Sequence, residues 1–269
     1  MKYFVFVVVF SFFISCKQEK KKMLNEEASK EIVAITTSNN YSEKLQQVFE
    51  AHGGVAQWKK MQSLVFELPK PDAREIHTIN LQTRQDKVET PSYTIGYDGI
   101  KTWLLDTDNS FKGDAVFYHN LMFYFYAMPF VLADDGIVYG ETAAVVYEGK
   151  SYPGVSIRYN PGVGTSYKDL YFIHFDPDTK QMAWLGYSVS YRSGESSDKF
   201  SWIHYNDWQT ISGLVLPKSI TWYKTEDGVL TEPRNTVSFE NVVLGKDVQP
   251  NTFFSKPEAA VFVEGKIQE

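Results

Sequence analysis

The sequence has a single cysteine, Cys16, among its 269 residues. One cysteine cannot form an internal disulfide, so the stability of the chain must come from its core. The sequence also lacks an excess of basic residues, because 27 Lys and Arg stand against 33 Asp and Glu, with a pI near 5.5. A chain without a basic face attracts phosphate backbones poorly, and we expect no nucleic-acid partner.

The common catalytic and nucleotide-binding motifs are absent as well. There is no G-x-S-x-G, no H-E-x-x-H and no P-loop, and "NPGVGTSYKD" lacks the Gly-Lys-Ser/Thr ending that cradles a phosphate. The stretch "DTDNSFKGD" begins like a calcium loop at Asp106, but Phe111 stands where such a loop needs glycine. We therefore predict no catalytic residue, no metal and no cofactor.

The histidines are the remaining candidates for chemistry. His52 ends a predicted helix, where the helix dipole alone favours a histidine. His119, His174 and His204 are spread over a predicted helix and two predicted strands, and only the fold could bring them together. A three-histidine zinc site is the weaker interpretation, and hydrogen-bonded core histidines are the stronger one.

One long apolar run is present, and it lies at the N-terminus. A positive Lys2 precedes the run from Tyr3 to Phe13, which is short for a membrane span of roughly 20 residues. The small Ser15 follows and stands directly before Cys16. This order is typical of a secretory signal, which we place at residues 1–15.

The sequence Phe13-Ile14-Ser15-Cys16 resembles the bacterial lipobox, at which lipoprotein signal peptidase cuts so that the cysteine becomes an acylated N-terminus. This resemblance implies that Cys16 is a lipid anchor and that a membrane is a partner through its acyl chains. The alternative is a conventional signal peptide in which Cys16 is incidental. Lys17 follows in place of an aspartate, which by resemblance to enterobacterial sorting favours an outer-membrane, lipid-anchored, periplasm-facing protein.

The rest of the chain divides into a polar tether at residues 16–40 and a single domain at residues 41–269. The domain opens with a short amphipathic helix that Ser42 caps and Gly53-Gly54 ends. Strand signals follow, with turns at Asp98-Gly99, Glu148-Gly149-Lys150, Asp176-Pro177-Asp178 and Ser212-Gly213. The Asp-Gly pair suits a type I′ turn. The pattern predicts consecutive antiparallel strands and a mainly β fold with a few helices.

Aromatic residues are abundant, with 17 Tyr, 19 Phe and 6 Trp. The segment from Asp114 to Met128 is apolar on all sides, which predicts one buried helix that Pro129 kinks or ends. We expect this helix to pack on the inner face of a curved sheet and to leave part of an apolar surface for a ligand. The predicted ligand-binding residues are Tyr97, Trp103, Phe117, Leu121, Tyr124 and Met128.

Several stretches together resemble the LolA/LolB-like lipoprotein-carrier superfamily. They are "AHGGVAQWKKMQSL", "YDGIKTW", "EGKSYPGVSI", "FDPDT" and "VLGKDVQPNTFFSKPE", and "FYFYAMPFVLADDG" resembles an uncharacterised group of lipoproteins from Bacteroidota-type bacteria. The resemblance implies a strongly twisted antiparallel half-barrel that helices close over an apolar cavity. It carries over no defined binding residue.

The resulting hypothesis is a lipid-anchored envelope protein that binds or carries a hydrophobic molecule or lipid. The alternative is a structural or envelope-assembly lipoprotein of the same fold with a filled core, and a weaker one is a hydrolase. The sequence does not determine the ligand, the protein partners or the oligomeric state.

Overall fold

The computed structural model describes residues 41–265 apart from 72, 162–167 and 192. The predicted signal peptide, the lipid anchor Cys16 and the tether all lie outside the described residues. Among the described helices none is long and apolar enough to cross a membrane.

The domain begins with a capped helix, as predicted. Helix α2 spans Glu43–Ala51, and the Ser42 side chain accepts a hydrogen bond from the backbone N–H of Leu45. Leu45, Val48 and Phe49 form its buried stripe. Two glycines with positive φ, Gly53 and Gly54, separate α2 from the short helix α3, Val55–Trp58.

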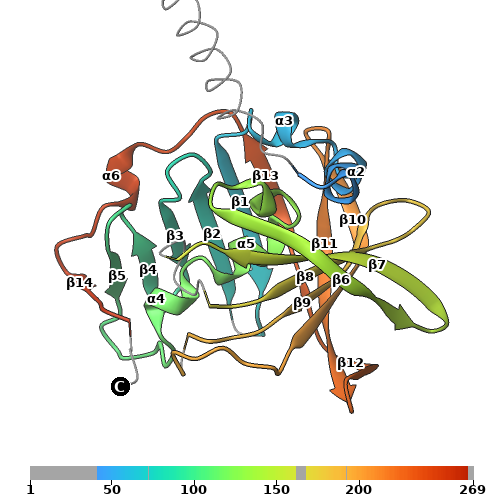
Figure 1. The fold of residues 1–269 in the computed structure, drawn as a ribbon. Coiled ribbons are helices and arrows are strands. Elements are labelled where there is room, and N and C mark those ends of the chain that lie inside the picture. Colours follow the sequence, from blue (N-terminus) through green and yellow to red (C-terminus); the bar gives the residue numbers. More distant parts are fainter. Residues whose placement is uncertain (1–40, 72, 162–167, 192, 266–269) are drawn as a thin grey trace, which may run out of the picture. The chain divides into compact units, whose positions relative to one another are not determined.

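The strands form two antiparallel sheets of seven strands each, which do not close into a barrel (Figure 1). The first sheet has the order β13-β1-β2-β3-β4-β5-β14, and the second has the order β12-β11-β10-β9-β8-β7-β6. Only Phe239 separates β12 from β13, so one stretch of chain passes from the second sheet to the first. The mainly β, antiparallel architecture with a few helices is thus confirmed.

The strand bounds follow the chain in order. The strands of the first sheet are β1 Ser63–Pro69, β2 Arg74–Asn80, β3 Asp86–Glu89, β4 Thr94–Tyr97, β5 Thr102–Leu105, β13 Glu240–Gly245 and β14 Val261–Phe262. Those of the second are β6 Ile137–Tyr147, β7 Lys150–Tyr159, β8 Tyr171–Phe175, β9 Met182–Tyr187, β10 Ser201–Ile211, β11 Leu214–Glu226 and β12 Val229–Ser238.

The predicted turns are present, but one has another geometry. Positive φ at both central residues marks Glu148-Gly149 and Ser212-Gly213 as type I′-like loops. At the β4–β5 turn only Gly99 has positive φ, and the Asp98 carboxylate accepts from the backbone N–H groups of Ile100 and Lys101. The expected type I′ turn is therefore wrong there, because the aspartate side chain stabilises a longer loop.

The predicted single helix from Asp114 to Met128 is two short helices instead. Helix α4 spans Ala115–Tyr118 and α5 spans Leu121–Tyr126. The break coincides with His119, whose side chain turns to Asp86 on β3. Aromatic residues also lose side-chain freedom in a helix, so this segment has little intrinsic reason to stay helical. Pro129 follows α5 and precedes the 3₁₀ helix η1, Phe130–Ala133.

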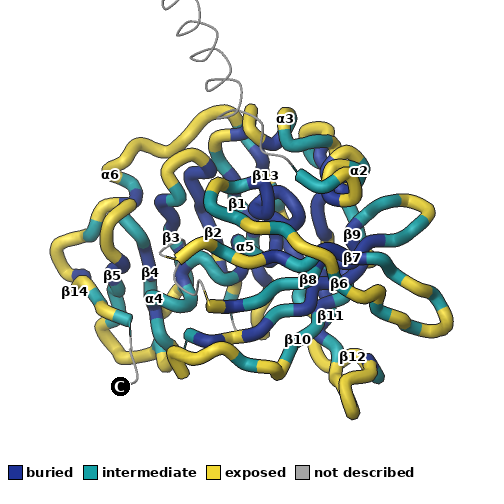
Figure 2. Tube along the Cα trace, viewed as in Figure 1, coloured by how far each residue is buried: buried dark blue, intermediate teal, exposed yellow. Residues whose placement is uncertain are grey.

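Helix α5 fills the space between the two sheets. Tyr126 stacks on Phe66 of β1 with ring centroids 5.1 Å apart. On the other side, Phe125 meets Trp222 of β11 at 5.6 Å, and the hydroxyl of Tyr205 on β10 donates to the Phe125 carbonyl. Figure 2 shows the buried residues gathered where the sheets face each other, with the exposed ones at hairpin tips. The interior of the fold at α5 is packed with side chains.

Candidate functional site

A cleft lies at one end of the first sheet, beside α4. Its volume is about 520 Å³, which is within the usual range of about 300–1,000 Å³ for small-molecule sites. Three segments line it: the β1–β2 connection, the β3–β4 turn and the chain around α4. The residues are Lys70, Pro71, Ala73, Arg74, Glu75, Thr90, Pro91, Ser92, Tyr93, Phe111, Gly113, Asp114, Phe117 and Tyr118. We call it the aromatic cleft.

Four rings form most of the apolar lining of the aromatic cleft. Phe111 lies between Tyr93 and Tyr118, with ring centroids 5.0 and 5.8 Å away. Phe117 packs beside Tyr191 at 4.8 Å. These tilted contacts are favourable for aromatic pairs, so the rings support one another around the hollow.

Local sequence explains why Phe117 and Tyr118 reach the cleft. Asp114 is the N-cap of α4, and its carboxylate accepts from the backbone N–H groups of Val116 and Phe117. The Tyr191 hydroxyl also donates to Asp114 at 3.1 Å. The cap therefore fixes the first turn of α4, which carries both aromatic side chains.

Buried polar groups form the floor of the cleft. Glu75 accepts hydrogen bonds from His77 Nε2 at 2.7 Å and from the Tyr118 hydroxyl at 2.6 Å, and the Tyr93 hydroxyl is 3.4 Å from its other oxygen. Burial would raise the pKa of Glu75, but the hydrogen bond from His77 and the other donors outweigh it and lower that pKa. The carboxylate is thus held ionised and rigid below the rings.

The same donors respond in the opposite direction. Burial, with the nearby Glu75 carboxylate, raises the pKa of Tyr93 to about 12 and raises that of Tyr118 further. Both phenols are therefore neutral at physiological pH and serve as hydrogen-bond donors. Together with His77 they form a satisfied network, which makes the floor a fixed support.

A second histidine–carboxylate pair lies farther along the same face of the sheet. His119 Nδ1 donates to Asp86 Oδ2 at 2.6 Å, and the Tyr97 ring stacks on His119 with centroids 5.0 Å apart. The other Asp86 oxygen is buried and has no hydrogen-bond partner among the described residues. The pair connects the end of α4 to β3.

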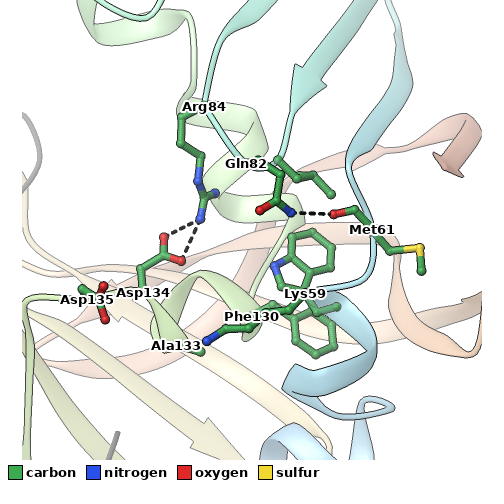
Figure 3. A pocket seen from close by; sticks show the side chains of 10 residues that line it. Lys59, Met61, Gln82, Arg84, Phe130, Ala133, Asp134 and Asp135 are labelled. Carbon is green, nitrogen blue, oxygen red and sulfur yellow. Dashed lines mark hydrogen bonds and ion pairs between the residues drawn. The ribbon is translucent and has the colours of Figure 1, made fainter. Parts of the chain in front are cut away.

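A smaller hollow of about 370 Å³ lies between α3, the β2–β3 turn and η1. Figure 3 shows its two central contacts, the ion pair of Arg84 with Asp134 and the hydrogen bond from Gln82 to the Met61 carbonyl. The Arg84 guanidinium reaches both oxygens of Asp134, at 2.5 and 2.7 Å. These polar groups satisfy one another, so this hollow has fewer unused contacts than the aromatic cleft.

The structure places the predicted ligand-binding residues in three different surroundings. Phe117 lines the aromatic cleft. Leu121 and Tyr124 are partly buried against the main core, and Met128 is fully buried within it. For these four residues the role in ligand binding stays a prediction.

Tyr97 and Trp103 lie on opposite faces of the first sheet, contrary to expectation. Tyr97 pairs with Thr102 and Trp103 pairs with Gly96, and paired residues of neighbouring strands share a face. The Trp103 indole donates to the carbonyl of Phe254 on α6, which spans Asn251–Phe254. A Cβ at Gly96 would lie 2.2 Å from the Trp103 ring, so glycine makes room for the indole. The expectation that both rings face the aromatic helix is wrong for Trp103, and a ligand contact of either ring stays a prediction.

The candidate histidines also have separate surroundings. His52 is buried, with Nδ1 2.8 Å from the Val215 carbonyl and Nε2 accepting from the backbone N–H of Met182. His174 and His204 are both opposite Trp184 in the second sheet, whereas His119 pairs with Asp86 of the first. In the described part of the chain no cluster of three or more His, Cys, Asp or Glu side chains could hold a metal ion.

Sequence reasoning missed Glu75 and His77. The one available signal was their spacing of two in "REIHTIN", which places both on one face of a strand. That signal is weak because the apolar Ile76 between them would ordinarily be expected to face the core, and it is the exposed one.

Comparison with known proteins gives a partial family match and likenesses of fold. A family of unknown function, DUF6503, matches residues 106–224. No curated protein matches the sequence. A LolA superfamily protein from Nitrosomonas europaea is 10% identical, with a TM-score of 0.47 over 79% of this chain and 96% of that chain. A DUF1329 family protein from Desulfovibrio piger is also 10% identical, with a TM-score of 0.48 over 81% and 98%.

Both likenesses concern the fold alone, with TM-scores below 0.5. A LolA superfamily structure is among those that the chain resembles, as the sequence motifs predicted. The narrower grouping with lipoproteins from Bacteroidota-type bacteria stays a prediction.

Proposed function

We propose that this protein is a lipid-anchored envelope protein that binds the apolar part of a hydrophobic ligand in the aromatic cleft. The observation that carries the proposal is the lining of that cleft, where rings from three segments surround a hollow of ligand size above a rigid polar floor. Burial of one acyl chain there would stabilise a complex by about 0.8 kcal/mol per methylene.

The proposed cleft differs from the cavity implied by the family resemblance. Helix α5 packs on both sheets, and its aromatic side chains occupy the space between them at that level. A ligand in the aromatic cleft needs no displacement of α5, because the cleft lies beside α4 at the end of the first sheet. Phe117 is the predicted binding residue that both views share.

The packed interior also supports a second candidate, a structural or envelope-assembly lipoprotein with a filled core. In that case the aromatic cleft would be a surface recess without a ligand. The two candidates differ in one measurable property, which is saturable binding of an apolar molecule by the folded protein.

The first experiment uses delipidated full-length protein and an apolar fluorescent probe. We expect saturable probe binding, displacement by a long-chain fatty acid, and at least about tenfold weaker binding in Phe117→Asp, because a carboxylate would be desolvated against the rings. Phe117→Leu keeps the site apolar and should bind nearly as wild type does.

The matched control is Phe262→Asp, which makes the same chemical change at a ring that is 48% exposed on β14. It should leave probe affinity unchanged. Absence of saturable binding by the folded wild-type protein would favour the structural candidate. Equal losses in Phe117→Asp and Phe262→Asp would argue against the aromatic cleft as the binding site.

A further inference from the structure

The free edges of the two sheets are unequal in their protection. Natural edge strands avoid pairing with other chains through charges, proline or short length. Strand β14 has two residues, β13 begins with Glu240 in an ion pair with Arg74, and β12 carries exposed Pro233 among charged neighbours. Each of these three edges has one of the protective features.

Strand β6 is the fourth edge and has little of this protection. It is eleven residues long, reads "IVYGETAAVVY", and contains neither proline nor a basic residue. Glu141 is its one charge, and Val138 and Val146 are 50% and 59% exposed. Within the described residues no strand pairs with its outer side. A long, weakly charged edge of this kind is a template for another strand.

We propose that two copies of this protein associate by antiparallel pairing of their β6 strands. The stretch from Ile137 to Thr142 pairs regularly with β7, and an irregularity follows between Thr142 and Val145. The regular stretch is as long as a typical strand of about 5–6 residues, so it offers one unbroken pairing surface.

The side chains of this stretch favour a register centred on Gly140. Val138 then lies opposite Thr142 of the second copy, and Tyr139 lies opposite Glu141. β-Branched and aromatic pairs of this kind are favourable across strands. The same register brings the two glycines together at the centre, where no side chain separates the backbones.

Charge complementarity supports a second copy as the occupant. In this register Glu141 does not face the Glu141 of the second copy, and Lys44 lies 3.2 Å from its carboxylate within the same chain. The one charge on the edge is therefore balanced before association. A register centred on Glu141 would oppose two like charges directly and is disfavoured. The pairing depends on neither the aromatic cleft nor its ligand.

Disulfide trapping tests both the pairing and its register. In full-length protein carrying Cys16→Ser, an introduced cysteine is the only thiol. Residues directly opposite in an antiparallel pair have Cα atoms about 4.5–5.5 Å apart, which a disulfide can bridge. We expect a mixture of the Val138→Cys and Thr142→Cys proteins to form a mixed disulfide dimer, and each protein alone to form far less.

Val243→Cys is the matched control, since Val243 is 60% exposed on a strand of the other sheet. It should not form a disulfide with either β6 variant. Equal trapping of the control would overturn the proposal, because it would reflect random collision.

Sedimentation velocity of the full-length chain in detergent gives an independent test. We expect concentration-dependent association that Val138→Lys weakens by at least about tenfold and Val243→Lys leaves unchanged, because an edge lysine blocks strand pairing. A wild-type chain that stays monomeric at all concentrations, or one that associates equally well with Val138→Lys, would overturn the pairing through β6.

Discussion

At the scale of single residues, His52 makes stability depend on pH. The backbone N–H of Met182 must donate to Nε2, so Nδ1 carries the proton and donates to the Val215 carbonyl. Burial lowers the pKa of His52 from 6.5 to about 4, and the Val215 hydrogen bond offsets this only in part. The folded state therefore holds His52 neutral in a single tautomer.

The sign of the effect follows from proton uptake. Between pH 6.5 and about 4 the unfolded chain binds a proton at His52 that the folded chain does not. The free energy of unfolding therefore falls as pH falls through this window, by about 3 kcal/mol for this group. Urea unfolding at a series of pH values should show a shallower dependence in His52→Gln than in wild type, by about one proton.

His204 provides the contrast. Its ring stacks on Trp184 at 4.1 Å, its Nδ1 is buried without a hydrogen-bond partner among the described residues, and burial lowers its pKa to about 4. His204→Phe should also reduce the pH dependence, but it removes no hydrogen bond from that nitrogen and should cost little stability at pH 7. If His52→Gln kept the full wild-type pH dependence, the assignment of His52 as a titrating group would be wrong.

At the scale of elements, two turns meet through glycine. Gly53, between α2 and α3, has φ +97°, and a Cβ there would lie 2.3 Å from the Gly213 carbonyl oxygen in the β10–β11 turn. Gly54 has φ +86° but no atom within 4 Å of its would-be Cβ. The two neighbours thus share a left-handed backbone and differ in space.

Alanine at the two positions separates backbone strain from the turn contact. Gly54→Ala should cost about 1–2 kcal/mol of unfolding free energy, from the left-handed conformation alone. Gly53→Ala should cost at least about 3 kcal/mol, since one of the two turns must also move. Urea denaturation of both variants measures the difference, and equal costs would mean that the turns yield without resistance.

Elements with a strong local signal were predictable from the sequence. Ser42 and the glycine pair bound α2, and the turn residues predicted the hairpins at Glu148-Gly149 and Ser212-Gly213. The break after α4 was not predictable, because it depends on His119 reaching Asp86 of a distant strand. Sequence periodicity contains no information about such a tertiary contact.

The aromatic cleft was predictable only in part, for the same reason. Phe117 stood out as one of an apolar stripe, whereas Glu75 and His77 contradict the usual burial pattern of a strand. Their burial is tolerated because tyrosine hydroxyls from two other segments complete the hydrogen bonds. Only the assembled fold brings those groups together.

At the scale of the whole molecule, the anchor and the binding cleft are expected to be separable. The predicted anchor is Cys16, and the aromatic cleft is built entirely from residues between Lys70 and Tyr118. A ligand-binding domain on an acyl anchor would stay at one membrane while it samples its ligand. Removal of the anchor should therefore change location without changing affinity.

The corresponding experiment is Cys16→Ser in cells that produce the full-length protein. Acylation needs the cysteine thiol, so we expect palmitate labelling to disappear and the protein to lose its firm membrane association, because stable anchoring takes more than one acyl chain. Ser15→Ala keeps a small residue before the cysteine and should still be labelled and membrane-bound. The Cys16→Ser protein should bind the apolar probe as tightly as the acylated protein does. If it stayed in the membrane fraction and uncleaved, the apolar run from Tyr3 to Phe13 would itself be the anchor, and the lipoprotein assignment would fall while the cleft could still be tested on its own.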